Sequence, residues 1–394
     1  MKFTVKTARI SALSAAALAA IMQLASCSDD PAPKIEIQGT QVTTAQKSPK
    51  MKGVFVLNEG NMGTNKASVD YFDYSNGKYY LNLFPSTNPD ITLGLGDTGN
   101  DIQVWNGKVY IVVNGSNLVE VVDGKSFKHV ASVTIPSPRS IAFNGNYAYV
   151  TSYADPSDTS GASLTKGSVY RINLNTNTVE GTVTVGYQPE GIACFNGRLF
   201  VANSGGYMYP DYDHTVSVID PALMTIEKTI NCGLNLGKVA LDANGNLFVV
   251  STGNYSTVQS KIYVVNTATA QLSDSIDTRV SAIAAAGDKL YIIGVEYKAP
   301  TYEATTSYSL YNISTKTLGE GGFITDATDS RIIMPYALAV NSETGEIFVA
   351  DAGDYVNPGQ LHCYSADGKC QWAATTGIIP GHMAFTTTAL KGLQ

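Results

Sequence analysis

The chain has 394 residues, of which 44% are hydrophobic and 15% charged, and its formal net charge is −7 at pH 7. An acidic chain without a basic stripe binds nucleic acid and anionic lipid surfaces poorly, so we expect neither as a partner. The length alone suggests two or three domains, but an internal repeat indicates one large domain instead.

Residues 1–26 have the features of a secretory signal. Three basic residues precede the apolar run Ile10–Leu24, which is short and interrupted by Ser and therefore does not predict a membrane span. The segment ends Leu24-Ala25-Ser26-Cys27, which resembles a bacterial lipobox, in which the Cys is acylated and becomes the mature N-terminus. We therefore expect lipidation at Cys27; the alternative is an ordinary secretory signal with an incidental Cys.

Residues 27–52 are expected to form the lipidated Cys and a flexible tether, because they are rich in Pro, Lys, Gln and Thr and lack periodicity. Asp29 and Asp30 resemble the surface-export signal of lipoproteins in the Bacteroides group, although a solvated acidic linker is the alternative. Several acyl chains on one Cys anchor a protein stably. We expect a lipid-anchored outer-membrane protein that faces the cell exterior and contacts the membrane only through this anchor.

Residues 53–394 repeat a pattern of one apolar, one aromatic and one β-branched residue at a mean step of about 49 residues. Its aromatic residues are Phe55, Tyr110, Tyr149, Phe200, Phe248, Tyr291 and Phe348. Six of the seven copies follow a turn that contains Gly, which tolerates the positive φ of a tight hairpin. This period in a strand-rich chain predicts an all-β, seven-bladed β-propeller with one four-stranded blade per repeat.

Two further strand signals occur in register with this pattern, one for the innermost strand before it and one for a third strand after it. A third strand ends in Asp or Asn in six repeats, which suits the start of a turn. The first repeat lacks its innermost strand, and Pro380–Phe385 matches the innermost strands of other repeats. We therefore predict that the C-terminus supplies the inner strand of the first blade and closes the ring, which hides two sheet edges.

The loops that follow the aromatic pattern vary widely in length, whereas the turns that precede it are short. All these variable loops open on one face of the ring, together with the connections into the inner strands, and they are rich in Tyr and Asn. Tyr supplies stiff contact area with a polar tip, and Asn supplies adaptable donors and acceptors, so this face suits a large, polar, partly planar ligand. The alternative is that Tyr and Asn are simply common in surface loops of β proteins.

The candidate ligand contacts combine these loop residues with the residues that precede the inner strands. They are Asn58, Glu59, Asn61, Asp101, Asn114, Arg139, Tyr153, Tyr187, Glu190, Asn203, Tyr207, Tyr209, Tyr212, Tyr255, Tyr297, Tyr336, Tyr355 and His382. For each charged residue at the channel mouth, an ion pair between blades is the alternative.

The sequence lacks the motifs of common hydrolases and nucleotide-binding enzymes, so we expect no catalytic residues and a binding protein that requires no cofactor. The cysteines and histidines show no metal-ligand spacing, so no metal is expected. A disulfide between Cys363 and Cys370 would require an altered strand register.

Three stretches carry a family resemblance: Leu57–Gly63, Leu95–Ile102 and Val112–Asn117. They resemble the YncE-like propeller lipoproteins of Bacteroides-type bacteria, and residues 53–386 are similar to the BtuG-type surface lipoproteins. That resemblance implies binding of cobalamin or related corrinoids and their transfer to a TonB-dependent transporter of the BtuB type. A carbohydrate-binding or adhesion propeller and a lactonase-like hydrolase or lyase are the two alternatives.

Overall fold

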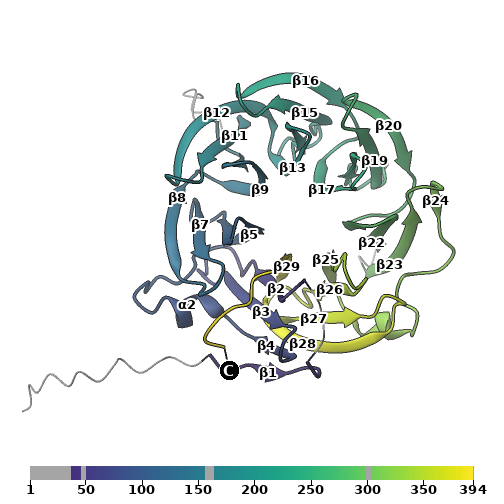
Figure 1. Ribbon diagram of the computed structural model, residues 1–394. Helices are drawn as coiled ribbons and strands as arrows, with labels where there is room; N and C mark the ends of the chain where they lie inside the picture. The colour runs from purple at the N-terminus through teal and green to yellow at the C-terminus, as the bar shows by residue number, and fades with distance from the viewer. Residues whose placement is uncertain (1–36, 46–49, 156–163, 299–302, 394) are drawn as a thin grey trace, which may run out of the picture. The chain divides into compact units, whose positions relative to one another are not determined.

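The computed structural model describes residues 37–45, 50–155, 164–298 and 303–393. Seven antiparallel sheets surround a central axis, and the colour in Figure 1 follows the chain once around the ring. The predicted seven-bladed β-propeller is confirmed. The expected signal segment and Cys27 lie outside the described residues. Among the residues that are described, none belongs to a helix long and apolar enough to cross a membrane.

The first blade contains strands from both ends of the chain. From the axis outward its strands are β29 (Pro380–Thr386), β2 (Gly53–Asn58), β3 (Ser68–Asp73), β4 (Lys78–Tyr80) and β1 (Thr40–Gln41). The short helix α2 (Leu83–Thr87) follows β4 and buries Leu83 and Phe84 in the core between the first two blades.

The other six blades each use four strands that are consecutive in the chain, with the first strand innermost. The second blade contains β5 (Gly99–Trp105), β6 (Lys108–Val113), β7 (Leu118–Asp123) and β8 (His129–Thr134). The third contains β9 (Pro138–Asn144), β10 (Tyr147–Ser152), β11 (Lys166–Asn173) and β12 (Thr178–Tyr187). The fourth contains β13 (Pro189–Phe195), β14 (Arg198–Asn203), β15 (Thr215–Asp220) and β16 (Thr225–Asn231).

The remaining three blades follow the same plan. The fifth contains β17 (Leu236–Leu241), β18 (Asn246–Ser251), β19 (Lys261–Asn266) and β20 (Gln271–Ile276). The sixth contains β21 (Ala282–Ala286), β22 (Lys289–Lys298), β23 (Glu303–Asn312) and β24 (Thr317–Leu318). The seventh contains β25 (Pro335–Val340), β26 (Ile347–Asp351), β27 (Pro358–Tyr364) and β28 (Cys370–Ile378), and the 3₁₀ helix η1 (Thr328–Arg331) precedes it.

The repeated turn residues adopt the local structure that the sequence predicts. Asn106 and Gly107, between β5 and β6, have φ values of 46° and 75°, which is the left-handed conformation of a tight hairpin. At the end of β3, the Asp73 carboxylate accepts a hydrogen bond from the Ser75 amide at 2.7 Å. Asp or Asn side chains accept equivalent bonds after the third strands of five further blades.

The ring closes through the predicted pairing of the two chain ends. β29 runs antiparallel to β2, with Gly53 opposite Thr386 and Leu57 opposite His382. The pairing continues beyond the strands, because the Glu59 amide donates to the Ile379 carbonyl at 2.8 Å. An inner and a second strand from opposite ends of the sequence therefore complete one sheet, which removes two exposed edges.

Residues 37–45 differ from the flexible tether that the sequence predicts up to residue 52. β1 pairs with β4, Ile37 is buried, and Ile37 forms a parallel bridge with Leu393. Gln38 and Gly39 separate Ile37 from β1, and both residues of β1 are polar, so hydrophobic periodicity gave no signal for this short strand. The described part of the expected tether thus covers the outer edge of the first blade, which would otherwise be open at β4.

The described cysteines are all free. Cys363 lies opposite Trp372, whereas Cys370 lies opposite Tyr364 beyond a register shift. Cys363 packs in the core shared with the first blade, and Cys370 packs against the core shared with the sixth. The two thiols therefore occupy opposite faces of the seventh blade, which excludes a disulfide in this register.

Candidate functional site

The loop face, which carries the variable loops and the starts of the inner strands, contains a recess of about 970 Å³. Its walls come from the loop after β18, the end of β22, the start of β25 and the loop after β26. Four of the predicted tyrosines line it: Tyr255, Tyr297, Tyr336 and Tyr355. A concave site of this size on a rigid ring is typical of small-molecule and cofactor pockets.

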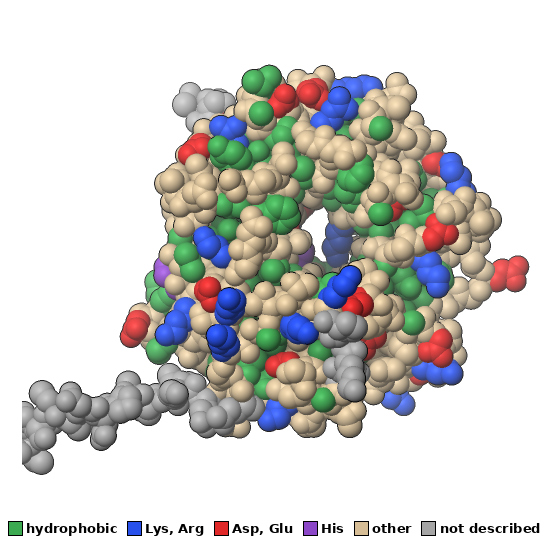
Figure 2. All heavy atoms as spheres, in the orientation of Figure 1, with side chains coloured by type: hydrophobic (Ala, Val, Ile, Leu, Met, Phe, Trp, Pro, Cys, Tyr) green, Lys and Arg blue, Asp and Glu red, His purple; other side chains and the backbone are tan. Residues whose placement is uncertain are grey.

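A second cavity of about 320 Å³ lies along the axis, among the inner strands. It shares Arg139, Glu190, Gly237, Lys238 and Tyr336 with the recess, so the recess opens into this channel cavity. Figure 2 shows the hole at the centre of the ring. A ligand held by the loops therefore has polar and charged groups beneath it.

Irregular starts of the inner strands explain why charged side chains gather at the axis. In six blades the pairing between the inner and second strands shifts near the start of the inner strand. A bulge at this point changes the direction of the side chains that precede the regular strand. The residues brought to the channel in this way include Asp101, Arg139, Glu190, Lys238 and His382.

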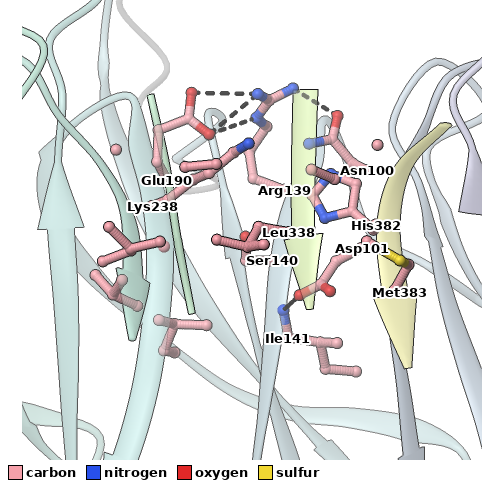
Figure 3. A pocket seen from close by; sticks show the side chains of 18 of the residues that line it. Asn100, Asp101, Arg139, Ser140, Ile141, Glu190, Lys238, Leu338, His382 and Met383 are labelled. Atoms are coloured by element: carbon pink, nitrogen blue, oxygen red, sulfur yellow. Dashed lines mark hydrogen bonds and ion pairs between the residues drawn. The ribbon is translucent and has the colours of Figure 1, made fainter. Parts of the chain in front are cut away.

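Arg139 is held by three neighbours at the mouth of the channel. Its Nε donates to Glu190 Oε2 at 3.1 Å, and its Nη2 lies 3.0 Å from the same oxygen. Its Nη1 donates to Asn100 Oδ1 at 2.6 Å (Figure 3). The Tyr153 hydroxyl also donates to Glu190, and the Tyr153 ring lies 4.8 Å from the guanidinium carbon. The Arg139–Glu190 pair thus links the third and fourth blades and is internally neutral.

Glu59, on the loop after β2, lies on the opposite side of the channel mouth. Its carboxylate accepts a hydrogen bond from the Tyr336 hydroxyl at 3.3 Å and lies 3.8 Å from His382 Nε2. Burial raises the pKa of the Glu59 carboxyl to about 7, although Lys238 acts in the opposite direction. This group therefore changes its charge near neutral pH.

Asp101 and His382 lie deeper along the inner strands. The Asp101 carboxylate accepts backbone hydrogen bonds from Ile102 at 2.8 Å and from Ile141 at 3.0 Å. Burial nevertheless raises the pKa of Asp101 to about 6. Burial also lowers the pKa of His382 to about 3, and the nearby cations act in the same direction, so His382 is neutral at pH 7.

Two groups of loop tyrosines lie at the recess or beside it, and Tyr153 and Tyr207 form a separate edge-to-face pair. Tyr336 and Tyr355 meet edge to face in the recess, with ring centroids 5.8 Å apart. Tyr297, which is 54% exposed, lies nearby and its hydroxyl contacts Met334 Sδ at 3.8 Å. On the neighbouring blades, Tyr212 lies between Tyr209 and Tyr255, at centroid distances of 6.0 and 6.5 Å. Tyr255 also lines the recess, so the second group reaches its edge.

The candidate ligand contacts fall into groups that lie inside or outside the two cavities. The residues that line the recess or the channel cavity are Glu59, Asp101, Arg139, Glu190, Tyr255, Tyr297, Tyr336, Tyr355 and His382. Tyr153 supports this set through Glu190. Tyr187, Tyr207 and Tyr209 lie outside both cavities, and the latter two are 65% and 75% exposed. Tyr212 is almost fully buried beside Tyr209.

The four predicted asparagines bond to the protein itself. Asn58 and Asn203 are fully buried, and their amides donate to side chains of the adjoining third strands. Asn61 donates to the Tyr355 carbonyl at 2.6 Å, and Asn114 donates to the Pro138 carbonyl at 2.9 Å. The interpretation of Asn58 and Asn203 as ligand contacts is therefore corrected, since both lie inside their blades and tie neighbouring strands together.

Lys238 is the main residue of the site that the sequence-based list lacks. It lies in β17 directly before Val239, where regular pairing with β18 begins, and it lines both cavities. Lys238 directly precedes Val239, as Asp101 precedes Ile102 and His382 precedes Met383 in their blades, so the repeat itself contained the signal. Arg279 and Glu296 were also missed; they form an ion pair of 2.6 Å on the wall of the recess.

The described part of the chain contains no group of three or more His, Cys, Asp or Glu side chains arranged to hold a metal ion.

The ring and its recess define the chain as a seven-bladed β-propeller with a candidate ligand site on the loop face. Residues 52–369 match the family described as a domain of unknown function (DUF5074), and the chain belongs to this family. No curated protein matches the chain.

Solved structures share the fold at low sequence identity. A quinonprotein alcohol dehydrogenase-like protein from Bacteroides thetaiotaomicron is 17% identical, with a TM-score of 0.60 over 85% of this chain and 78% of that one. Kuenenia stuttgartiensis hydrazine synthase is 14% identical, with a TM-score of 0.60 over 73% of this chain and 89% of that one. A functionally unknown protein from Desulfotomaculum acetoxidans is 15% identical, with a TM-score of 0.58 over 85% and 99%.

Proposed function

We propose that this protein is a cell-surface lipoprotein that captures cobalamin or a related corrinoid and passes it to a TonB-dependent transporter of the BtuB type. The observation that carries the ligand-capture proposal is the recess of about 970 Å³ with four tyrosines on its walls. Tyrosine rings give a large ligand extensive contact area at a low cost in conformational entropy. The choice of a corrinoid comes from the resemblance of Leu57–Gly63 and the two later stretches to the BtuG-type lipoproteins.

The recess suits a ligand that is broad and polar. Exposed aromatic rings at Tyr255 and Tyr297 offer faces against which a planar macrocycle packs. Ser256, Gln259 and Ser260 lie along the same wall and offer donors and acceptors to polar side groups. These two kinds of contact match the chemistry of a corrin ring that carries amide side chains.

Titration of the purified protein tests this proposal. Cyanocobalamin is added while visible absorption and heat are recorded, and a panel of neutral oligosaccharides is titrated in parallel. A saturable response to cyanocobalamin at one site per chain supports corrinoid capture. A response to an oligosaccharide with none to cyanocobalamin replaces it with the carbohydrate-binding alternative.

The proposed location depends on Cys27, which lies outside the described residues. Cys27→Ala is expected to release the protein from membranes, because acylation of this residue supplies the anchor. Replacing Asp29 and Asp30 with Ala is expected to leave the protein anchored but less accessible to protease on intact cells. Unchanged accessibility would remove the export argument.

A propeller hydrolase or lyase is the second candidate, and the Glu59 carboxyl favours it. A carboxyl group with a pKa of about 7 that lines the channel cavity has the properties of a general acid or base. Glu59→Gln separates the two functions. If the protein is an enzyme, this variant binds its substrate but loses turnover, whereas a capture protein shows no turnover in either form.

A further inference from the structure

Lys238 lies where the recess meets the channel cavity and contributes to the lining of both. Its Nζ donates a hydrogen bond to the Tyr336 carbonyl oxygen at 2.8 Å and lies 5.2 Å from the centroid of the Tyr336 ring. The side chain thus reaches across the axis from the fifth blade to the seventh.

The ammonium group has no anionic partner of its own. Among the described residues, no carboxylate oxygen lies within 4.0 Å of Lys238 Nζ, in contrast to Arg139, whose guanidinium is paired with Glu190. One of the three Nζ hydrogens is used by the Tyr336 carbonyl, which leaves two donors for a group in the cavity. Figure 3 shows the Lys238 amine beside the Arg139–Glu190 pair with no dashed contact to either.

The surroundings make this arrangement electrostatically unfavourable without a ligand. Burial lowers the pKa of Lys238, while Glu59 and Glu190 act in the opposite direction. A charge in a desolvated place is stabilised strongly by an opposite charge within hydrogen-bonding distance. The recess provides the access by which such a group reaches Nζ.

We infer that the ligand of the recess carries a negatively charged oxygen group, a carboxylate or a phosphate, which enters the channel mouth and accepts hydrogen bonds from Lys238 Nζ. This inference rests on the proposed capture function and specifies the chemistry of one part of the ligand. The tyrosine walls hold the body of the ligand, and Lys238 fixes its orientation because the anionic group has to point down the axis.

Glu59 links this anion to pH. The groups that face Glu59 across the channel are Tyr336 on β25, His382 on β29, Lys238 on β17, Arg139 on β9, Glu190 on β13 and Asp101 on β5. An anion beside Lys238 repels the Glu59 carboxylate, so binding favours protonated Glu59. The ligand is therefore expected to bind with uptake of a proton and more tightly at pH 6 than at pH 8.

The first arm of the test uses free anions. Inorganic phosphate and acetate are titrated into the wild type, Lys238→Met, Lys238→Arg and the control Lys289→Met, which changes an exposed lysine on the opposite face. Acetamide serves as the neutral analogue of acetate. Heat and the NMR signals of ¹⁵N-labelled lysine report binding, and circular dichroism verifies folding of each variant.

We expect phosphate or acetate, but not acetamide, to bind the wild type and Lys289→Met. Lys238→Met is expected to weaken anion binding by about tenfold or more, because it removes one charge-assisted hydrogen bond. Lys238→Arg is expected to retain part of the anion affinity. Equal anion affinity in the wild type and Lys238→Met, or no anion binding to the wild type, overturns the inference. The relative response to phosphate and acetate distinguishes the two kinds of anion.

The second arm uses corrinoids with and without an anionic group. Cyanocobalamin contains a phosphodiester, whereas cobinamide lacks it. Lys238→Met is expected to weaken cyanocobalamin binding by about tenfold or more and to leave cobinamide binding nearly unchanged. If both corrinoids bind the variant as they bind the wild type, corrinoid capture stands and the anion inference fails. If free anions depend on Lys238 but neither corrinoid binds, the corrinoid proposal fails and the anion subsite stands.

Discussion

Single residues at the channel mouth combine charge with burial. Glu59 keeps its proton up to a pH of about 7 in the folded protein because of burial, whereas an ordinary glutamate loses it near 4.5. The folded state therefore binds more protons than the unfolded state between these values. Stability consequently falls as the pH rises from about 4.5 to 7 and stays reduced above that range.

Glu59→Gln tests this linkage, because the amide keeps the shape of the side chain without its titration. We expect the variant to gain stability over the wild type, and the gain to be larger at pH 8 than at pH 5 by about 2–3 kcal/mol. Urea unfolding at both pH values measures this difference. Asp101 titrates in both proteins and cancels in the comparison, so an identical gain at pH 5 and pH 8 would show that burial does not perturb Glu59.

Asn203 illustrates a residue whose type suggested ligand binding and whose position determines another role. Its Nδ2 donates to Thr215 Oγ1 and to Ser217 Oγ, both at 3.0 Å, and its Oδ1 accepts from the Gly186 amide at 3.2 Å. The sequence places Asn203 at the end of the second strand of its blade. It does not show whether the Asn203 side chain points to solvent or to the next strand.

Asn203→Ala is therefore expected to lower the free energy of unfolding by about 2–3 kcal/mol, because several buried partners lose their hydrogen bonds. Ligand affinity is expected to remain that of the wild type. Asn175→Ala, at an exposed turn on the opposite face, is the control and should change stability by no more than about 0.5 kcal/mol. Loss of affinity without loss of stability in Asn203→Ala would restore Asn203 as a ligand contact.

At the level of strands and loops, local chemistry predicted most of the architecture. Three local signals recur in all or nearly all of the seven blades: the Gly turns, the Asp or Asn at the end of the third strand, and the inner-strand pattern. Because they repeat, these signals predict strands even though each single copy is weak. α2 and β1 were missed because each occurs once. α2 is stabilised by burial of Leu83 and Phe84 between the first two blades, and β1 by pairing with β4, rather than by a sequence pattern of their own.

The loops were predicted less completely for a physical reason. The loop with Tyr207, Tyr209 and Tyr212 has the highest density of tyrosine, yet the recess forms around Tyr255 and Tyr297, one and two blades further on. Which loops surround a common space depends on their paths above the ring, and long loops of irregular structure do not encode that path in any local pattern. The sequence therefore predicted that the ligand site lies on the loop face, but it did not predict where on that face the recess forms.

Across the whole molecule, the ring depends on a pairing between the two ends of the propeller. β29 supplies six residues of the first blade that lie opposite residues of β2. Without β29, β2 loses its inner neighbour and the first blade no longer reaches the axis. The neighbouring blades then lose a packing surface on that side.

Deleting residues 380–394 is expected to abolish cooperative unfolding or to lower the melting temperature far more than deleting residues 37–45. The second deletion removes β1, an edge strand of two residues, and serves as the control for truncation itself. Calorimetry of the two truncated proteins measures the difference. Equal melting temperatures would contradict closure of the ring by the C-terminal strand.

The recess as the ligand site is best tested by calorimetric titration of cyanocobalamin into single tyrosine variants. Tyr297→Ala and Tyr355→Ala remove walls of the recess, and each is expected to weaken binding by about 1–3 kcal/mol. Tyr209→Ala, which removes a more exposed ring outside the recess, is expected to bind like the wild type. Wild-type affinity in both recess variants, or an equal loss in Tyr209→Ala, would contradict the assignment of ligand binding to this recess.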